Sequence, residues 1–214
     1  MKIYRLPFIG QQLKTVILAN GEFPKHPIAS SILNNCEYLV CCDGAINNLE
    51  KTIKIPDAIV GDCDSLSEES YIKYKDIIHH IAEQETNDLT KAVHFCLKQG
   101  RSEITILGAT GKREDHTIAN ISLLSDYANE SDVEMITDYG IFNAIGSDSI
   151  FESYPKQQIS IISIDRNTIS SENLVYKIEN QIFTNWWQAT LNESESSQFE
   201  IKTSGRTIVY RAFL

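Results

Sequence analysis

The sequence predicts two domains, an N-terminal α/β domain and a C-terminal all-β domain. From Lys14 to Asp138, short β-branched runs alternate with helical patterns, which is typical of a mainly parallel sheet with helices on both faces. Beyond that stretch the helical period disappears, and short strands follow one another between turn residues, as in a small antiparallel β-sandwich. We place the boundary near Asp138–Gly146, which gives expected domains of residues 1–140 and 141–214.

The N-terminal half contains six runs with the composition of buried parallel strands. The expected strands are Thr15–Ala19, Tyr38–Cys42, Ala58–Val60, Ile77–Ile81, Ile104–Leu107 and Val133–Ile136. Between the fourth and fifth strands, apolar residues recur at helical spacing in Leu89, Ala92, Val93, Cys96 and Leu97. We expect that helix to end at Gly100, because glycine is favoured just beyond a helix C-terminus.

The C-terminal half shows strand patterns without helices between them. The expected strands are Ile159–Ile164, Leu174–Ile178, Phe199–Ile201 and Thr207–Phe213. Turn residues such as Asp165-Arg166-Asn167 and Ser204-Gly205 separate them, which favours an antiparallel arrangement. The segment Met1–Gln12 fits neither pattern clearly, and both an edge strand and a tail remain open for it.

Composition excludes several classes of protein. The formal net charge of -10 opposes binding to nucleic acid, which requires a concentrated basic surface. The apolar run Val16–Ala19 is too short for a signal peptide or a membrane span, so we expect a cytoplasmic protein. The 5 cysteines form no C-x-x-C pair, which favours buried thiols in a reducing compartment over disulfides or a zinc site.

Acidic residues follow four of the predicted strands. They are Asp43, Asp62 and Asp64, Asp88, and Asp115. Ligands of an open parallel sheet bind beyond the carboxyl ends of its strands, so we expect these carboxylates to meet at one rim. The pair Asp62 and Asp64 flanks a single residue, and like charges that close repel each other unless a cation lies between them.

Helix capping is the alternative explanation for some of these polar residues. Ser65-x-x-Glu68 fits a capping box, and Asn87 or Asp88 would suit the start of the next helix. Asp115 would suit the start of the helix that comes after that one. Capping needs only one short polar residue for each helix, however, and it does not explain the Asp62-x-Asp64 pair.

The ligand types predict a magnesium-nucleotide site. Carboxylates without histidine or thiolate partners favour Mg²⁺, which proteins hold with one or two carboxylates, waters and substrate phosphates. Lys112, Arg113 and Lys91 are the conspicuous positive residues for those phosphates. No phosphate-binding G-x-x-x-x-G-K-[ST] loop is present, because Gly108-x-x-Gly111-Lys112 is too short, and no G-x-G-x-x-G occurs either.

Five spaced motifs, taken in order, resemble the thiamine pyrophosphokinase family. They are Asn20-Gly21, Asp43-Gly44-Ala45, Pro56-Asp57-x-x-x-Gly61-Asp62-x-Asp64-Ser65, Thr86-Asn87-Asp88-Leu89 and Gly111-x-Arg113-x-Asp115-His116-x-x-x-Asn120. The C-terminal part is more weakly similar to the family's thiamine-binding β domain, through Asn173-Leu174-Val175-Tyr176 and Ala189-Thr190-Leu191-Asn192. The likeness covers most of the chain.

The resemblance implies that ATP transfers its diphosphoryl group to the hydroxyl of thiamine, which gives thiamine diphosphate and AMP. Residues 1–140 would be the ATP- and magnesium-binding domain and residues 141–214 the thiamine-binding domain of a homodimer, with thiamine between domains of different chains. The catalytic residues would be Asp43, Asp62, Asp64, Asp88, Arg113 and Asp115, with Mg²⁺ on Asp62, Asp64 and Asp88. The ATP-binding residues would be Asn20, Gly21, Gly44, Gly61, Lys91, Gly111, Lys112, Arg113 and His116. Thiamine would contact Asp115, Asn120, Trp187, Thr190 and Asn192.

Three positions leave alternatives open. His116 is a candidate general base, but a structural histidine at a helix start is equally compatible with the sequence. Of the adjacent Trp186 and Trp187, we expect one to face the thiazolium cation and the other to pack in the core or a dimer interface. Leu191 stands where the family often has serine, which leaves open whether one hydrogen bond to thiamine is kept.

Two other classes of function remain open at this stage. One is a Mg²⁺-dependent phosphatase, or a nucleotidyl or sugar-nucleotide transferase, that uses the Asp62-x-Asp64 pair. The other is a sensor that binds thiamine or a nucleotide without turnover. A sensor has no need for so many carboxylates facing phosphate.

Overall fold

The computed structural model describes residues 1–214, which group into two compact units. The α/β unit comprises Phe8–Leu123 and Glu130–Asp138, and the β unit comprises Met1–Pro7, Leu124–Asn129 and Tyr139–Leu214. The sequence assigned residues 1–7 to the α/β domain, whereas here they belong to the β unit. The reason is strand pairing, because β1 (Lys2–Tyr4) is a short edge strand that runs parallel to β9 (Ser149–Glu152).

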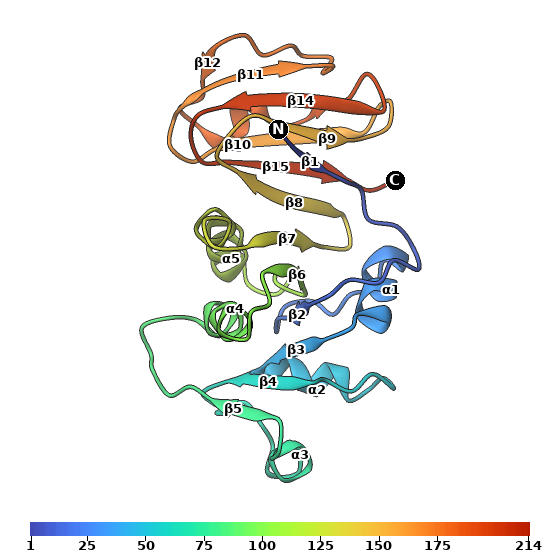
Figure 1. The fold of residues 1–214 in the computed structure, drawn as a ribbon, viewed down its shortest axis with the longest axis vertical. Coiled ribbons are helices and arrows are strands. Elements are labelled where there is room, and N and C mark those ends of the chain that lie inside the picture. Colours follow the sequence, from blue (N-terminus) through green and yellow to red (C-terminus); the bar gives the residue numbers. More distant parts are fainter. The chain divides into compact units, whose positions relative to one another are not determined.

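The α/β unit alternates strands and helices (Figure 1). Its strands are β2 (Val16–Leu18), β3 (Leu39–Cys42), β4 (Ala58–Gly61), β5 (Ile78–His80), β6 (Glu103–Leu107) and β7 (Asp132–Ile136). Its helices are α1 (Pro27–Asn35), η1 (Asp43–Ala45), α2 (Ile46–Leu49), α3 (Glu68–Tyr74), α4 (Asp88–Lys98) and α5 (Glu114–Tyr127), the last of which ends among residues of the β unit. Each of the six predicted N-terminal strands is present, and no end differs from the prediction by more than one residue.

All strand pairs of the α/β unit are parallel. The spatial order is β7-β6-β2-β3-β4-β5, so the chain builds from β2 towards β5 in one direction and then crosses back to β6 and β7. The order reverses between β2 and β6, and the carboxyl ends of such a pair of strands leave room for a ligand.

The centre of this sheet is buried on both sides. Every residue of β2, β3 and β4 is buried, and consecutive residues of a strand point to opposite faces. Helix α4 packs against these three strands through its apolar stripe, and α1 packs against β2. The predicted end of α4 is confirmed, because Gly100 follows it with φ of +72° and its N–H bonds to the Leu97 carbonyl.

The β unit contains two sheets that share one core. The first sheet has the order β1-β9-β14-β11-β12 and the second includes β8, β15, β10 and β13. Their remaining strands are β8 (Gly140–Ile145), β10 (Gln158–Ser163), β11 (Thr168–Glu172), β12 (Gln181–Ile182), β13 (Asn192–Glu193), β14 (Gln198–Thr203) and β15 (Thr207–Ala212). Apart from the β1–β9 pair, the pairing is antiparallel.

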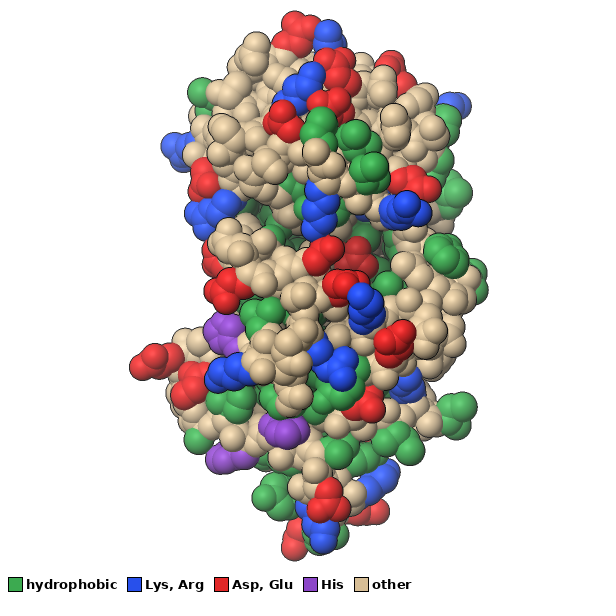
Figure 2. Space-filling model, viewed as in Figure 1, with side chains coloured by type: hydrophobic (Ala, Val, Ile, Leu, Met, Phe, Trp, Pro, Cys, Tyr) green, Lys and Arg blue, Asp and Glu red, His purple; other side chains and the backbone are tan.

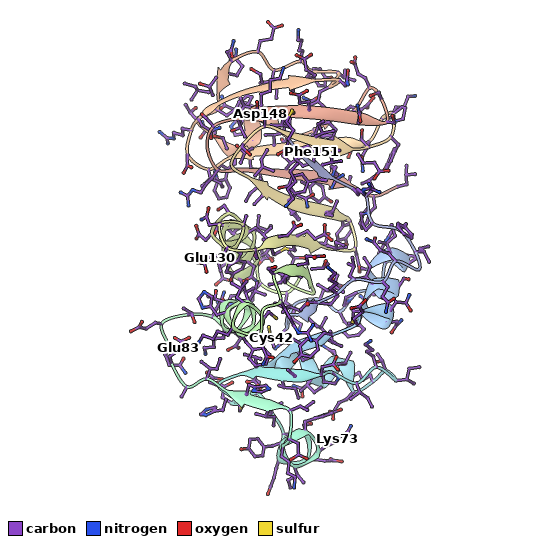
Figure 3. All side chains as sticks on the ribbon, in the orientation of Figure 1. Cys42, Lys73, Glu83, Glu130, Asp148 and Phe151 are labelled. Atoms are coloured by element: carbon purple, nitrogen blue, oxygen red, sulfur yellow. The ribbon has the colours of Figure 1, made fainter.

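The core between the two sheets combines aromatic and aliphatic side chains. Phe151, labelled in Figure 3, stacks on Tyr4 and Phe199 with ring centroids 5.0 Å apart in each pair. Ile159 and Val209 from the second sheet belong to the same buried cluster. This shared core confirms the antiparallel β region that the sequence predicts after residue 139.

One predicted strand of the β unit is wrong. Leu174–Ile178 forms no strand, and only an isolated bridge joins Leu174 to Ser194. Asn173, with φ of +62°, turns the chain just before it, and the backbone of Tyr176 bonds to the Asn192 side chain in place of a neighbouring strand. A run of β-branched and aromatic residues without a strand partner therefore stays irregular.

Two further features bear on the excluded classes of protein. No helix of the chain combines the length and the apolar character that a membrane crossing requires. The face of the molecule in Figure 2 carries acidic and basic side chains interspersed, without a continuous basic surface. This distribution agrees with the net charge of -10.

Candidate active site

A pocket of about 460 Å³ lies in the α/β unit at the carboxyl ends of the strands, where the strand order reverses. It is lined from the segments that follow β2, β3, β4 and β6 and from the start of α4 and α5. The predicted site residues in its lining are Asn20, Gly21, Asp62, Asp88, Lys91, Lys112, Arg113, His116 and Asn120. Residues that are distant in sequence thus lie around one pocket.

The loops after β2 and β6 are tied together at the mouth of this pocket. The Gly21 N–H donates to the Gly108 carbonyl at 2.5 Å, and the Glu22 N–H donates to the Thr110 carbonyl at 2.7 Å. A side chain at position 21 would collide with the Gly108 carbonyl, so only glycine permits this approach. Lys112 donates from Nζ to Asn20 Oδ1 at 3.0 Å, which places its ammonium group over the same loops.

Three carboxylates form a cluster beside the pocket. One oxygen from each of Asp43, Asp62 and Asp64 lies within 4.8 Å of the other two. The register of the sheet produces this cluster, because Cys42 of β3 pairs with Val60 of β4 and the next residues are Asp43 and Gly61. The sequence placed the metal on Asp62, Asp64 and Asp88, whereas the structure brings Asp43 into the group with Asp62 and Asp64.

Asp43 is the buried member of the cluster, with an exposed fraction of 1%. Its Oδ2 accepts the Ser65 N–H at 3.0 Å, while its Oδ1 has no hydrogen-bond partner. A Cβ atom at Gly61 would lie 2.6 Å from the Asp43 Cβ, so glycine at position 61 is needed for this packing. Burial, followed by the nearby carboxylates, raises the pKa of Asp43 above its usual value.

Neighbouring groups control the ionisation of the other carboxylates. Gln84 donates from Nε2 to Asp62 Oδ2 at 3.0 Å, and this hydrogen bond lowers the pKa of Asp62. Asp88 begins α4, and burial raises its pKa although Lys91 opposes the shift. The Lys91 side chain is only 2% exposed, and its Nζ donates to Asp88 Oδ1 at 3.3 Å.

The start of α4 is fixed by a chain of side-chain amides. Asn87 is the N-cap residue, and its Oδ1 accepts the Thr90 N–H at 2.9 Å, which confirms the capping alternative for this residue. Its Nδ2 donates to Asn120 Oδ1 at 3.3 Å, and Asn120 in turn donates to the Ala109 carbonyl at 2.8 Å. Both side-chain groups of Asn120 therefore hold the α4, α5 and β6 segments together.

Two other capping alternatives are not realised. Helix α3 is capped by Ser67, whose hydroxyl accepts the Ser70 N–H, and Ser65 instead donates its N–H to Asp43. Asp115 lies inside the first turn of α5 and not before it. Ser65 and Asp115 are consequently free of the capping role that the sequence allowed.

Arg113 and Asp115 form a bidentate ion pair at the start of α5. Arg113 donates from Nε to Asp115 Oδ1 at 3.1 Å and from Nη2 to Oδ2 at 2.6 Å. This pairing lowers the pKa of Asp115 to about 2, helped by the N–H of His116. Asp115 is thus a carboxylate at neutral pH, and both side chains are well exposed and able to exchange this contact for a ligand.

The predicted thiamine residues Trp187, Thr190 and Asn192 belong to the β unit. Trp186 and Trp187 lie on the short helix η2 (Trp186–Ala189) with exposed fractions of 49% and 72%, so neither packs in the core. Asn192 is buried, and it both accepts from and donates to the backbone of Tyr176. Both polar groups of its side chain are therefore already hydrogen-bonded to the backbone of Tyr176, which fixes the chain next to Leu191.

The donor set around Asp43 fits a magnesium ion. Oxygen ligands predominate, one of them is a buried carboxylate oxygen without a protein partner, and unpaired buried charge is costly unless a cation offsets it. Four further residues line the pocket that the sequence did not predict as site residues, namely Gln84, Thr110, Thr117 and Thr86, the last of which was named only as part of a motif. Their only signal was position, because each lies within a few residues of a strand end or a helix start.

Comparison with known proteins gives a consistent result. Residues 29–137 match the model "Thiamin pyrophosphokinase, catalytic domain", and residues 140–210 match "Thiamin pyrophosphokinase, substrate-binding domain". The thiamin pyrophosphokinase 1 of Caenorhabditis elegans is 28% identical in an alignment of 197 positions that covers 84% of this chain and 81% of that protein.

Solved structures show the same fold. The thiamin pyrophosphokinase from Candida albicans has a TM-score of 0.81 at 20% identity and covers 100% of this chain and 93% of its own. The thiamine pyrophosphokinase from Bacillus subtilis has a TM-score of 0.77 at 22% identity and covers 93% of this chain and 99% of its own. At this identity the likeness concerns the mixed α/β fold with its C-terminal antiparallel β region.

Proposed function

The chain belongs to the thiamin pyrophosphokinase family, and on this basis we propose that it transfers the diphosphoryl group of ATP to the hydroxyl of thiamine. The alcohol oxygen attacks the β-phosphorus, the bond from that phosphorus to the oxygen of the α-phosphate breaks, and AMP leaves. The hydroxyl proton is released to solvent. The observation that carries the proposal is the carboxylate cluster of Asp43, Asp62 and Asp64 beside a pocket with three cationic side chains.

We assign magnesium binding to Asp43, Asp62 and Asp64, with Asp88 beside them. When bound, the ion would offset negative charge on the polyphosphate. The buried Asp43 oxygen supports this assignment, because a cation is the partner it lacks. Gln84 and the Ser65 N–H hold two of the carboxylates in fixed orientations, so little rearrangement is needed when the ion binds.

We assign phosphate binding to Lys91, Lys112 and Arg113. Lys91 is buried and held by Asp88, so its charge acts in surroundings of low dielectric constant, where it is strongest. Diphosphoryl transfer passes through a loose transition state, so positioned positive charge supplies most of the acceleration.

Asp115 orients the acceptor alcohol in this proposal. While it is paired with Arg113 its pKa is about 2, so it is a carboxylate and a hydrogen-bond acceptor at neutral pH. Phosphate binding to Arg113 would release Asp115 from the ion pair and leave it available for the alcohol.

We further propose that thiamine contacts the β unit of a partner chain in a homodimer. The exposed Trp187 offers a face for the thiazolium cation, and Tyr176, Trp186 and Leu191 are further large apolar side chains that are exposed in the single chain. The five cysteines are free thiols, which fits the reducing conditions of the cytoplasm.

Phosphorus NMR of the protein with ATP, Mg²⁺ and thiamine tests the proposal. We expect AMP and thiamine diphosphate in equal amounts and no AMP when thiamine is omitted. The variant Asp62→Asn should lose the reaction, while Asp76→Asn, an exposed carboxylate outside the cluster, should retain it. ADP or free phosphate without thiamine diphosphate would mean a phosphatase or a different transferase, and tight thiamine binding without product would mean a sensor.

A further inference from the structure

Two asparagine side chains join the start of α4 to α5. Asn87, the N-cap residue of α4, donates from Nδ2 to Asn120 Oδ1 at 3.3 Å. Asn120 lies in the second turn of α5 and donates from its own Nδ2 to the Ala109 carbonyl at 2.8 Å. Both asparagines line the candidate active-site pocket. We call Asn87 and Asn120 the amide pair.

The second bond of each side chain fixes the direction of its amide. The Asn87 oxygen accepts the Thr90 N–H at 2.9 Å, so its NH₂ group is the one left to face α5. The Asn120 NH₂ group is bonded to the Ala109 carbonyl, so its oxygen is the one left to face α4. A donor therefore meets an acceptor, and neither amide can turn over without losing its second bond.

One face of α5 lines the pocket. The pocket residues of this helix and of the position before it recur at spacings of three or four, which places them on one side of the helix: Arg113, His116, Thr117 and Asn120. The Thr117 N–H donates to the Arg113 carbonyl at 2.9 Å, so the backbone of Arg113 belongs to the same helical turn. A shift of α5 at Asn120 would therefore move Arg113 as well.

The start of α4 carries the charged groups on the other side of the amide pair. Asp88 follows Asn87 directly, and Lys91 lies one turn further on with its ammonium group bonded to Asp88. The Lys91 N–H donates to the Asn87 carbonyl at 3.0 Å, so Asn87 fixes this turn through its backbone and its side chain. Helix α4 packs against β2, β3 and β4, on the same side of the sheet as α5 (Figure 1). The amide pair ties the starts of the two helices directly to each other.

We propose that the amide pair positions the groups that act in diphosphoryl transfer, by holding Asp88 and Lys91 on α4 in alignment with Arg113 at the start of α5. The inference rests on the proposed function and concerns the alignment of the same site. Asn87 and Asn120 are positioning residues, which act through the helices that they join. Asn120 accordingly affects thiamine indirectly, in place of the direct contact that the family resemblance implies.

Loss of the amide pair should lower kcat and leave KM nearly unchanged. A polyphosphate that lies between two sets of charged groups keeps its contacts with each set when the helices shift slightly, so its affinity changes little. The loose transition state requires that the attacking and leaving oxygens be aligned. A misplacement of about 1 Å can cost roughly 100-fold in rate.

Asn87→Ser tests the pair, because serine caps a helix about as well as asparagine but is too short to reach Asn120. We expect kcat for AMP formation to fall about tenfold, with KM for ATP and for thiamine within about twofold of the wild type. Asn120→Ser should lower kcat at least as much. Adding Asn87→Ser to Asn120→Ser should cause no further loss, because both changes remove the same bond.

Asn35→Ser is the matched control. It removes the bond from Asn35 Nδ2 to Ser31 Oγ, a hydrogen bond of 3.2 Å that lies on α1 and outside the pocket, and it should leave kcat unchanged. The urea midpoints of the wild type, the two single variants and the double variant give a readout that does not depend on turnover. We expect the shifts of these midpoints to be non-additive, as for two residues in direct contact.

Wild-type kcat in Asn87→Ser would overturn the inference, as would additive losses of kcat or additive midpoint shifts in the double variant. A raised KM for thiamine in Asn120→Ser with normal kinetics in Asn87→Ser would also overturn it, because that result means direct contact with thiamine. A wild type that forms no AMP would overturn the proposed function, and the midpoints would still decide whether the pair joins the helices. AMP formation by the wild type and, at the same rate, by Asn87→Ser would overturn this inference alone.

Discussion

Replacing Asp43 by asparagine should stabilise the protein while removing its response to magnesium. The carboxylate is buried, and its oxygen lies within 4.8 Å of oxygens from Asp62 and Asp64. At that separation Coulomb's law gives a repulsion of about 0.9 kcal/mol for each pair even at the dielectric constant of water. Asparagine keeps the oxygen that accepts the Ser65 N–H but loses the charge on that hydrogen bond, which offsets about 0.5–1 kcal/mol of the gain.

The expected net effect at pH 7 without magnesium is a rise of about 1 kcal/mol in the free energy of unfolding. The sign follows from the raised pKa of Asp43 in the folded protein. Between its unfolded value and the raised value the folded state binds more protons, so wild-type stability falls as pH rises through that window. The stability of the asparagine variant does not fall in this way, because asparagine does not titrate. With free Mg²⁺ at ten times its dissociation constant, the wild type gains about 1.4 kcal/mol, and the variant gains little.

Urea unfolding followed by circular dichroism, with EDTA and then with Mg²⁺, measures both effects. The order of the two midpoints should reverse between the conditions, at equal dependence on urea concentration. Asp76→Asn is the matched control, because that exposed carboxylate lies outside the cluster and should change neither midpoint. A variant that is less stable than the wild type in EDTA would refute the account of repulsion in the cluster.

Further predictions concern the packing and the pH response. Gly61→Ala should destabilise by about 1–3 kcal/mol in thermal unfolding and weaken Mg²⁺ binding in calorimetry, because the new methyl group meets the Asp43 side chain. Asn87→Ala should lower the unfolding free energy by about 1 kcal/mol through loss of the α4 cap. Mg²⁺ affinity measured by calorimetry should begin to fall at a higher pH than an ordinary aspartate would give, because the pKa values of Asp43 and Asp88 are raised and the ion needs their charged forms. Phe151→Ala should cost about 3–5 kcal/mol in urea unfolding through the cavity that it leaves in the β unit.

The α/β unit was predictable from sequence because each of its elements carries its own local signal. Its central strands are continuous apolar runs, since both faces of the sheet are covered, and α4 has an apolar stripe with a terminal glycine. The β unit was less predictable because its strands alternate and depend on partners. The strand β1 pairs with a segment almost 150 residues away in the chain, at Ser149–Glu152, and no local pattern reports such a pairing.

The candidate site was likewise predictable from the sequence only in part. That Asp43, Asp62 and Asp64 meet follows from the rule for parallel sheets and from adjacent strand ends. That Asp43 is buried and Asp64 exposed does not follow, because it depends on the register of β3 and β4 and on the missing side chain at Gly61. Gln84 was missed for a related reason, since it lies in a polar loop whose only relevant contact is the one that folding makes with Asp62.

Position in the sheet separates the carboxylates to which we assign magnesium from two of the cations to which we assign phosphate. The carboxylates follow β3 and β4, whereas Lys112 and Arg113 follow β6, on the other side of β2. A polyphosphate lying across the ends of β2 and β6 would then have metal-binding groups on one side and positive side chains on the other. Lys91 is the exception, because it lies on α4 on the side of the carboxylates, where it forms an ion pair with Asp88. Lys91→Met should therefore weaken Mg²⁺-dependent nucleotide binding and also raise the pKa of Asp88 further. Lys112→Met should weaken nucleotide binding without changing the pKa of Asp88. If nucleotide affinity depended on pH in the same way in the two variants, this division would be contradicted.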